Sequence, residues 1–465
     1  MWNIVRTIAT GLAYTTLVAA VMKKPHEKTP PHEDHEASPE DRGIIPGKWI
    51  VTFKDNVPDH VFTRFQQHIH KRSEDGTFKV NHVYDMAAGA FRGLSLDGPA
   101  DAVEAMGEHE WVKRVEPDRW IHLAEDRTNG KETESFEPGD EKQPGNAYWN
   151  LDMISHPKRL KEASNPEYTC TGSCGAGIDI YIIDTGINNH TEFEGRLTHE
   201  YSACALEGDR GYGAGDSEGH GTHVAAIAAG ATRGVARKAN IISIRAFCSY
   251  SSPASNTVKA IEWAVNSMTL KRAQNRTVIN LSAGGWRLND RDASMDAVKK
   301  AVELGAFFSL AAGNDNHNVS GYSPAAEPSA CTVGGVDRNS DLWARTNWGN
   351  GIDILAPATD ISSADFGATA RFVKKSGTSM ASPHVAGAAA VLLSTYKWDS
   401  SVVCDRLRLS PNEVAHDIGT NTTRKILYTF TDGEPKFDNG TVRFRPTSKT
   451  RGTRSIRRSL PWYEV

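Results

Sequence analysis

Four residues with complementary chemistry stand at the ends of apolar, strand-like stretches or at the starts of Ala-rich, helix-like stretches. Asp184 directly follows IDIYII, and His220 opens HGTHVAAIAAG. Asn314 follows AFFSLAAG, and Ser379 lies at the start of SMASPHVAGAAAVLL. The four supply a carboxylate, an imidazole, an amide and a hydroxyl, which are the groups that acyl transfer requires.

The chemistry suggests one role for each group. A serine hydroxyl is a weak nucleophile until a base removes its proton, and an imidazole can do this near neutral pH. A carboxylate beside the imidazole fixes its tautomer and stabilises the imidazolium. Donors from a helix N-terminus and from an amide side chain can stabilise an oxyanion. We therefore expect Asp184, His220 and Ser379 to act together, with Asn314 as an oxyanion donor.

Two of these residues also have structural alternatives. We expect the last helix to begin between residues 379 and 382, with Pro383 in its first turn, where a missing N–H has no partner to lose. Ser379 could then serve as the helix N-cap. An Asp after a strand is a common turn former, so Asp184 could have that role instead.

The histidines of the HGTH stretch allow a different interpretation as well. His220 and His223 lie one helical turn apart and could bind a metal ion, but the HGTH stretch itself holds no acidic third ligand. Alternatively, His223 packs against its own helix and has only a structural role.

The elements that must position these residues alternate between strands and helices from about residue 148. Apolar strands are expected at 177–183, 240–247, 277–282 and 306–312, and helices at 256–268 and 292–304. Continuous apolar strands that alternate with helices predict a parallel sheet covered on both faces. Ligands bind at the carboxyl ends of such strands, where the four residues lie.

The ordered motifs DTG, GHGTHVA, AAGN and SGTSMASPHVAG resemble those of the subtilase family of serine peptidases. The stretches YSPAAEPSACTVGGVDRNS and IDILAPATDISS resemble its proteinase K-like group. The resemblance spans residues 148–430 and implies a subtilisin-like α/β fold, with a mostly parallel central sheet flanked by helices. It implies that Ser379 is the nucleophile, His220 the general base and then acid, and Asp184 the residue that orients His220. Asn314 would donate to the oxyanion beside the backbone N–H of Ser379.

The resemblance also implies how a peptide substrate is held. In the family, one pocket binds the side chain of the substrate residue that precedes the cut. The residues that match its walls here are Ser282, Ala283, Gly284 and Gly285 on one side, and Ala312 and Gly313 on the other. Small walls leave a roomy apolar pocket, so we expect broad specificity, with aromatic or aliphatic residues before the cut.

Three positions depart from the pattern of the close relatives. Ala283 stands where a larger apolar residue is usual, and Ala226 where Gly is usual. The usual Gly-Ser-Gly of the other substrate-pairing segment is replaced by Ser251-Ser252-Pro253. Because Pro cannot donate to a strand ladder, we expect Pro253 to remove one hydrogen bond to the fourth substrate residue.

A structural calcium ion is a further implication of the resemblance. Pro328, Ala330 and Asp353 match a site of the proteinase K-like group, in which two backbone carbonyls and one carboxylate bind Ca²⁺. The alternative is that Asp353 merely caps a turn. No catalytic cofactor is expected.

Six cysteines suggest disulfides in a secreted chain. Three pairs are expected: Cys331–Cys404, Cys204–Cys248 and Cys170–Cys174. The first pair matches a disulfide of the family. The second pair would lie within bridging distance if the two strands that precede its members are parallel neighbours. The third pair would close a short loop.

The chain divides into six segments by composition and pattern. They are a signal peptide (1–20), a polar linker (21–46), an α+β domain (47–124), a second linker (125–147), the main α/β domain (148–431) and a basic tail (432–465). In the α+β domain we expect strands at 49–53, 90–96 and 112–123, and helices at 61–73 and 101–111. This domain resembles the inhibitor propeptide that precedes such enzymes, which implies a self-made cut near residues 123–125.

The whole sequence predicts a secreted serine endopeptidase, made as a self-processing precursor. Its partners would be protein or peptide substrates and its own propeptide. A net charge of −4 gives no reason to expect nucleic acid, the N-terminal apolar run is too short for a stable membrane anchor, and we expect a monomer. Six Asn-x-Ser/Thr triplets permit glycosylation. One alternative is a vacuolar protease of the same chemistry. Another is an inactive binding protein of this fold, but the intact Asp, His, Asn and Ser argue against it.

Overall fold

The computed structural model describes most of the chain between Gly43 and Phe430. Side chains are described for residues 43–126, 148–156, 168, 170, 172–204, 215–414 and 421–430, and the backbone alone for residues 135–136, 435–438, 441–444 and 463–464. The expected signal peptide, most of both linkers and most of the basic tail lie outside the described residues. Within the described ranges, no helix combines the length and the apolar character needed to cross a membrane.

The N-terminal region (residues 43–126) forms an antiparallel sheet in the order β4-β1-β3-β2. Its elements are β1 (Ile44–Phe53), α1 (Asp59–Glu74), β2 (Lys79–Met86), β3 (Phe91–Asp97), α2 (Ala100–Glu104), the 3-10 turn η1 (Ala105–Glu108) and β4 (Val112–Leu123). Apolar side chains from α1, α2 and the strands form a separate small core. The region is therefore an α+β sandwich, and its first strand begins within the segment expected to be linker.

Two expectations for this region are wrong in detail. The sequence does not predict strand β2, because KVNHVYDM mixes polar and apolar residues and only Tyr84 and Met86 of it are buried. The helix expected over 101–111 ends at Glu104 and continues only as a 3-10 turn, in which Gly107 disfavours a longer helix.

The main region (residues 148–430) is built on a nine-stranded sheet in the order β18-β19-β15-β14-β12-β10-β6-β8-β7. In chain order its strands are β6 (Asp179–Asp184), β7 (Leu197–Ser202), β8 (Asn240–Arg245), β10 (Thr277–Leu281), β12 (Ala306–Ala311), β14 (Cys331–Val336), β15 (Ile354–Pro357), β18 (Asn412–Glu413) and β19 (Lys425–Ile426). All neighbours pair in parallel except β18 and β19. The expected parallel sheet and its four predicted strands are confirmed.

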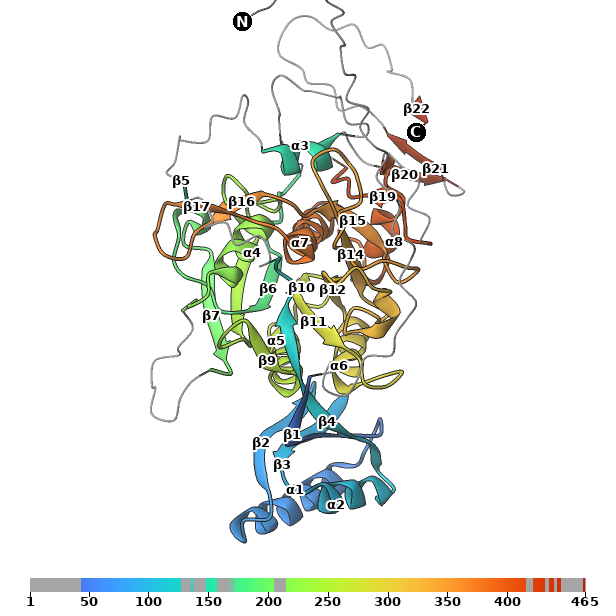
Figure 1. Cartoon of the computed structure of the whole chain (residues 1–465). Coiled ribbons are helices and arrows are strands. Elements are labelled where there is room, and N and C mark those ends of the chain that lie inside the picture. The colour runs from blue at the N-terminus through green and yellow to red at the C-terminus, as the bar shows by residue number, and fades with distance from the viewer. Residues whose placement is uncertain are drawn as a thin grey trace, which may run out of the picture. The chain divides into compact units, whose positions relative to one another are not determined.

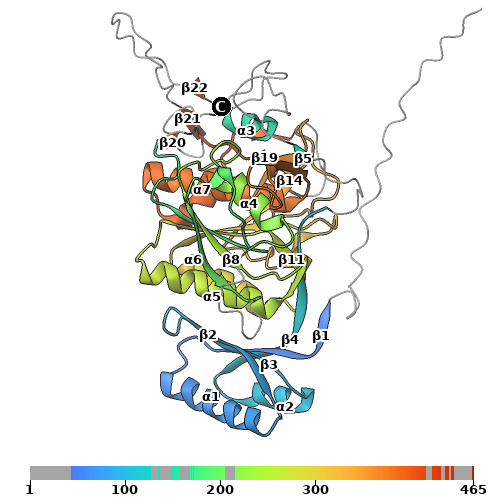
Figure 2. The ribbon, with the colours of Figure 1, turned by 90° about the vertical axis from the view of Figure 1, so that its left-hand side faces the viewer.

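Helices cover both faces of this sheet (Figures 1 and 2). They are α3 (Trp149–Ser155), α4 (His220–Ala229), α5 (Ala254–Leu270), α6 (Ala293–Glu303), α7 (Thr378–Tyr396) and α8 (Val403–Leu407), with 3-10 turns η2 (Thr191–Phe193), η3 (Val319–Gly321) and η4 (Ser400–Val402). Helices α4 and α7 share one buried apolar cluster, whereas α5 and α6 share a second. The two clusters lie on opposite faces of the sheet.

Short strands complete the structure. They are β5 (Ser135–Phe136), β9 (Ser251–Pro253), β11 (Ala283–Trp286), β13 (Tyr322–Ser323), β16 (Ile361–Ala364), β17 (Phe372–Lys375), β20 (Pro435–Asp438), β21 (Thr441–Phe444) and β22 (Tyr463–Glu464). Of these, β9 and β11 matter most for function, because both of them pair with the N-terminal region.

Strand β4 belongs to both regions. Its first half pairs with β1, and its last residues lie between β9 and β11 of the main region, with Ile121 opposite Ser252 and His122 opposite Gly284. Figure 1 shows β4 rising from the small sheet toward the centre of the large one. One continuous strand therefore delivers the end of the N-terminal region to the middle of the main region.

Helix α7 is buried over nearly its whole length and begins one residue earlier than expected. Its N-cap is Gly377, and no side chain caps it, so the N-cap role suggested for Ser379 is wrong. Pro383 is the sixth helical residue and lies in the second turn rather than in the first. Since Pro383 has no N–H to donate to the Ser379 carbonyl, that oxygen accepts the Ser282 hydroxyl instead, at 3.0 Å.

Two carboxylates of β4 cap helices of the main region. Glu116 accepts the N–H of Ala293 at the start of α6, at 2.8 Å, and Asp118 accepts both the N–H and the hydroxyl of Ser255 at the start of α5, at 3.1 and 2.6 Å. Helix N-termini favour negative charge. The two residues are only 3% and 2% exposed, so this contact excludes water, and burial raises the pKa of both carboxyl groups.

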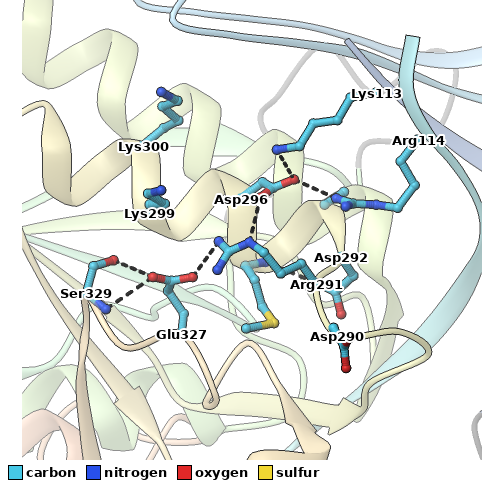
Figure 3. A network of polar contacts seen from close by, with 12 residues as sticks. Lys113, Arg114, Asp290, Arg291, Asp292, Asp296, Lys299, Lys300, Glu327 and Ser329 are labelled. Carbon is cyan, nitrogen blue, oxygen red and sulfur yellow. Dashed lines mark hydrogen bonds and ion pairs between the residues drawn. The ribbon is translucent and has the colours of Figure 1, made fainter. Parts of the chain in front are cut away.

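A network of ion pairs extends this contact around Asp296 in α6 (Figure 3). The carboxylate of Asp296 is almost fully buried and accepts hydrogen bonds from Lys113 and Arg114 of β4, at 2.9 and 2.5 Å. Arg291 donates to the other oxygen of Asp296 at 3.2 Å and to Glu327 at 2.7 Å. Asp296 thus joins cations from both regions.

This arrangement predicts that Asp296→Asn destabilises the uncut chain. In a Ser379→Ala background, we expect the free energy of unfolding to fall by about 1–3 kcal/mol, because three cations lose a buried charged acceptor. Denaturant unfolding curves would measure the change. Asp290→Asn is a matched control, since the Asp290 side chain is fully exposed, and a similar loss in both variants would contradict the prediction.

His384 in α7 predicts how stability depends on pH. Its ring is buried between the Met380 carbonyl (2.7 Å) and the Asn150 amide (2.8 Å), and burial lowers its pKa from 6.5 to about 4. Between these values only the unfolded chain takes up the proton. The free energy of unfolding should therefore fall by up to about 3 kcal/mol as pH drops from about 6.5 to about 4.

Unfolding curves of Ser379→Ala at several pH values would test this dependence. His384→Gln should flatten the slope over this interval, whereas His70→Gln should not, because the His70 side chain is 80% exposed. An unchanged slope in His384→Gln would show that other groups cause the acid sensitivity.

Candidate active site

Asp184 and His220 meet at the carboxyl end of β6. Asp184 is the last residue of β6, and His220 is the first of α4. The Nδ1 atom of His220 lies 2.7 Å from Oδ1 of Asp184, and both side chains are only 1% exposed. The carboxylate also accepts the N–H of Thr185 at 2.8 Å. A hydrogen bond from Nδ1–H leaves Nε2 of His220 as the basic nitrogen.

A second buried carboxylate, Asp216, organises the loop between these two residues. One of its oxygens accepts the Thr185 hydroxyl at 2.8 Å and the Gly219 N–H at 2.7 Å, and the other accepts both donors of Thr222 at 2.9 and 2.7 Å. Thr185 in turn accepts the N–H of Gly221. Asp216 thus ties the end of β6 to the start of α4. Asp216 is not among the residues predicted from the sequence, although it and Glu218 stand just before the GHGTH stretch.

Ser379 lies in the first turn of α7 and is completely buried. Its hydroxyl donates to the carbonyl of Ser282 at 2.8 Å. The Nε2 atom of His220 is buried and has no hydrogen-bond partner. The hydroxyl must therefore turn away from Ser282 before His220 can accept its proton.

Asn314 is held so that its amide N–H₂ remains available. Its Oδ1 atom accepts the N–H and the hydroxyl of Thr378, at 2.9 and 2.8 Å. Its Nδ2 atom is buried and has no hydrogen-bond partner. A buried donor without a partner is costly. Its presence here indicates that the amide donates a hydrogen bond to another group at some stage of the reaction.

The carbonyl oxygen of Ala124 occupies this part of the site. It accepts the backbone N–H of Ser379 at 3.0 Å, and a Cβ atom on Gly377 would lie 2.3 Å from it and 3.2 Å from Nδ2 of Asn314. Gly377 has a φ of +148°. Only glycine lets the backbone approach the carbonyl this closely.

The residues around Ala124 are paired like a bound peptide. The Ala124 N–H donates to the Ser282 carbonyl, and the Leu123 N–H donates to the Tyr250 carbonyl, both at 3.0 Å. On one edge, Leu123 lies opposite Ala283. The predicted substrate-pairing segment at 282–285 therefore holds the end of the N-terminal region.

The two predicted pocket walls both approach the ring of Tyr322, which is not among the residues predicted from the sequence. A Cβ atom on Gly284 would lie 2.9 Å from the Tyr322 ring, and one on Gly313 would lie 2.8 Å from it. Ala283 and Ala312 are buried beside these glycines. A cavity of about 230 Å³ adjoins Ala124 and is lined by Tyr322, Tyr250 and Gly285 among others. The small side chain of Ala124 leaves this space unfilled.

The expected cost of Pro253 is not found. Pro253 lies opposite Trp120, and Ser252 lies opposite Ile121. Counted back from the Ala124–Glu125 bond with Ala124 as the first residue, Ile121 is the fourth residue and Trp120 the fifth. Because Leu123 bonds to Tyr250, the alternation of an antiparallel ladder makes the Trp120–Pro253 pair a non-hydrogen-bonded one. The missing N–H of Pro253 would point away from β4, so no bond to this strand is lost.

His223 has the structural role rather than a metal-binding one. Its Nε2 atom lies 3.0 Å from the carbonyl oxygens of both Ile361 and Val373, and burial lowers the pKa of the ring well below 6.5. The ring thus fastens α4 to the β16–β17 hairpin.

The residues predicted to bind calcium lie at the end of β14 that carries Cys331. One oxygen of Asp353 accepts the Thr332 N–H at 2.7 Å, and the other forms a close ion pair with Arg408. The Arg408 guanidinium already supplies the positive charge that an ion would bring. Calcium binding by Asp353, Pro328 and Ala330 therefore stays a prediction, in which an ion would compete with Arg408 for the Asp353 carboxylate.

The structure contains all three predicted disulfides: Cys331–Cys404, Cys204–Cys248 and Cys170–Cys174. Strands β7 and β8, which precede the second pair, are parallel neighbours as expected. Because Cys331 and Cys404 are joined, their sulfur atoms cannot act with Asp353 as metal ligands. One predicted glycosylation triplet is inaccessible, since Asn280 is fully buried and accepts the Ser382 hydroxyl at 2.8 Å.

Comparisons with known proteins agree with this geometry. The subtilase family matches residues 175–442. "Subtilisin-like protease 3" of Arthroderma benhamiae is 34% identical over 392 residues, covering 83% of this chain and 91% of that protein. "Subtilisin-like protease 1" of Trichophyton rubrum is 31% identical over 437 residues, covering 91% of this chain and 78% of that protein.

A solved structure gives the same result for the fold. The crystal structure of a cold adapted subtilisin-like serine proteinase superposes with a TM-score of 0.53 at 34% identity, covering 61% of this chain and 99% of that one. These similarities, together with the site at the strand ends, lead to one conclusion: the chain belongs to the subtilase family and is a serine peptidase.

Proposed function

We propose that this chain is an inactive precursor that cuts its own Ala124–Glu125 bond, and that the product is a secreted endopeptidase. One observation carries the proposal: the Ala124 carbonyl accepts the N–H of Ser379 at 3.0 Å while its own N–H donates to Ser282. Residues 43–124 are accordingly the propeptide, and the uncut chain resembles an enzyme with a substrate bound.

The proposed reaction begins when the Ser379 hydroxyl leaves the Ser282 carbonyl and attacks the Ala124 carbonyl carbon. His220 takes the hydroxyl proton at Nε2, while Asp184 holds Nδ1–H and stabilises the imidazolium. The proton then passes to the nitrogen of Glu125, which leaves as an amine. Water, activated by the same imidazole, releases Ala124 as a carboxylate.

The oxyanion would be stabilised by two donors. The backbone N–H of Ser379 is already in place, and Nδ2 of Asn314 is buried, unpartnered and fixed by Thr378. Donors that are positioned before the reaction need no reorganisation when charge develops on the oxygen. The cost of the unpartnered amide in the uncut chain is consistent with such a role.

The tether explains why the first cut is favoured over others. Strand β4 holds the junction in register on both edges, so the reacting groups meet without the entropy cost of a bimolecular encounter. After the cut, Leu123 and Ala124 can stay paired as a product. We propose that the propeptide then inhibits the enzyme until it is degraded.

Specificity on the amino side of the cut is proposed to be broad and apolar. The cavity beside Ala124 is bounded by Gly285, Trp286 and Tyr322 and has room for a larger side chain. The site is complete within one chain, which supports a monomer. Three disulfides support passage through an oxidising compartment, which either secretion or vacuolar delivery would provide.

Calcium binding at Asp353 stays a prediction, and we carry it forward as a proposal. An ion would have to displace Arg408, whose side chain is 44% exposed and has room to move. A bound ion would stabilise the fold by mass action and take no part in the reaction.

The self-processing proposal predicts a new N-terminus at Glu125. Wild-type protein made in a secretory host should lose the propeptide, whereas Ser379→Ala should remain uncut, because little activity remains without the nucleophile. N-terminal sequencing and intact mass of both proteins would show the outcome. If Ser379→Ala is cut at the same bond in a host without related proteases, the proposal fails. Ser401→Ala is a control for the substitution, since Ser401 is exposed.

The calcium proposal predicts that added Ca²⁺ raises the unfolding midpoint of Ser379→Ala and that a chelator lowers it. Asp353→Asn should abolish both effects. Arg408→Gln should increase the effect of a given Ca²⁺ concentration, since the competing cation is gone. Persistence of the Ca²⁺ effect in Asp353→Asn would place the ion elsewhere, and no Ca²⁺ effect in any variant would rule out the ion.

A further inference from the structure

We propose that this enzyme prefers acidic residues on the carboxyl side of the cut, with Lys375 binding the first of them and Arg345 the second. The inference rests on the proposed function, because it takes the Ala124–Glu125 junction as a bound substrate. It names a substrate class: peptides in which an acidic pair follows the cleaved bond.

The backbone after the junction is held by the main region. The N–H of Asp126 donates to the Ser376 carbonyl at 2.8 Å, and the Tyr250 hydroxyl donates to the Glu125 carbonyl at 3.3 Å. Ser376 directly precedes Gly377, which contacts the Ala124 carbonyl. Residues on both sides of the junction are therefore fixed by neighbouring atoms of the same loop.

The side chain of Glu125 is bound by Lys375, the last residue of β17. The Lys375 Nζ atom lies 2.8 Å from Oε1 of Glu125, and the two side chains are only 11% and 9% exposed. A carboxylate this far from water is costly unless a cation and a hydrogen bond compensate it. This position should therefore discriminate between Glu and an uncharged residue of the same size.

The side chain of Asp126 is bound by Arg345. Its Oδ1 atom lies 2.9 Å from a guanidinium nitrogen, and the Asp126 side chain is 4% exposed against 37% for Arg345. Arg345 also reaches the carbonyl oxygen of Asn314, at 3.4 Å from its Nε atom. The guanidinium is thus fixed to the loop that carries the proposed oxyanion donor.

The two cations come from different elements, yet both face the segment on the carboxyl side of the cut, which becomes the N-terminus of the mature enzyme. Once this new N-terminus moves out of the site, a substrate would place its own first and second residues at Lys375 and Arg345. Acidic residues there would restore both ion pairs, whereas Lys or Arg would bring like charges together. Specificity is the difference between the affinities for two substrates. Here the ion pairs would favour acidic residues, and the repulsion between like charges would disfavour Lys and Arg.

The test uses the mature wild-type enzyme and a set of quenched fluorescent peptides. Each peptide contains Ile-His-Leu-Ala before the cut and one of four pairs after it: Glu-Asp, Gln-Asp, Glu-Asn or Gln-Asn. We expect kcat/KM for Glu-Asp to exceed that for Gln-Asn by about tenfold, with each single substitution costing about threefold. The preference should shrink between about 0.01 M and about 1 M NaCl, because salt screens partly exposed charges.

Variants assign each preference to its residue. Lys375→Gln should abolish the preference for Glu over Gln and keep that for Asp over Asn, and Arg345→Gln should do the reverse. Lys375→Glu should instead favour Lys as the first residue. Lys238→Gln removes one positive charge at an exposed position away from the site and should leave both preferences unchanged.

The outcomes separate this inference from the function on which it depends. Equal cleavage of all four peptides by the wild-type enzyme would overturn the inference and leave the peptidase function intact. Cleavage of none of them would overturn the proposed function, and the inference with it. The peptide series requires no variant, so a variant that fails to fold does not weaken the test.

Discussion

The structure depends on the pairing of one strand along both of its edges. Strand β4 is part of the small N-terminal sheet, and its last residues lie between β9 and β11 of the main region. Backbone pairing on two sides fixes the register and direction of the strand. The Ala124 carbonyl can therefore meet the N–H of Ser379 without any contribution from its own side chain, which is only a methyl group.

Buried polar groups around this strand fall into two classes. Glu116, Asp118 and Asp296 are compensated by helix N-termini or by cations, and they hold the two regions together. By contrast, Nε2 of His220 and Nδ2 of Asn314 are buried without partners. Buried polar atoms without partners are unfavourable in the uncut chain. In the proposed reaction, Nε2 of His220 would take up a proton, and Nδ2 of Asn314 would donate to the developing negative charge. Stability and reactivity thus come from different polar groups of one interface.

Charge is arranged differently on the two sides of the junction. Before the cut, the neighbours of Ala124 are small or aromatic, and recognition relies on backbone pairing. After the cut, two carboxylates face Lys375 and Arg345 in surroundings with little exposure to water. Apolar contacts tolerate many side chains, whereas paired charges are selective. The junction sequence Leu-Ala-Glu-Asp combines both kinds of recognition.

The sequence by itself determined the parallel sheet, its flanking helices, the order of the Asp, His, Asn and Ser motifs, and the three disulfide pairs. The sheet and its helices depend on local apolar patterns, and each motif has its residues close together in the chain. The Cys331–Cys404 and Cys204–Cys248 pairs, which are 73 and 44 residues apart, follow instead from the family resemblance and from the placement of two strands. The tertiary structure alone decided what depends on long-range register. It placed Pro253 opposite Trp120, in a non-hydrogen-bonded pair, and it paired Asp353 with Arg408. It also brought Lys375 and Arg345 beside Glu125 and Asp126. No local pattern encodes these contacts, because each joins segments whose distance in space is set by how the whole sheet packs.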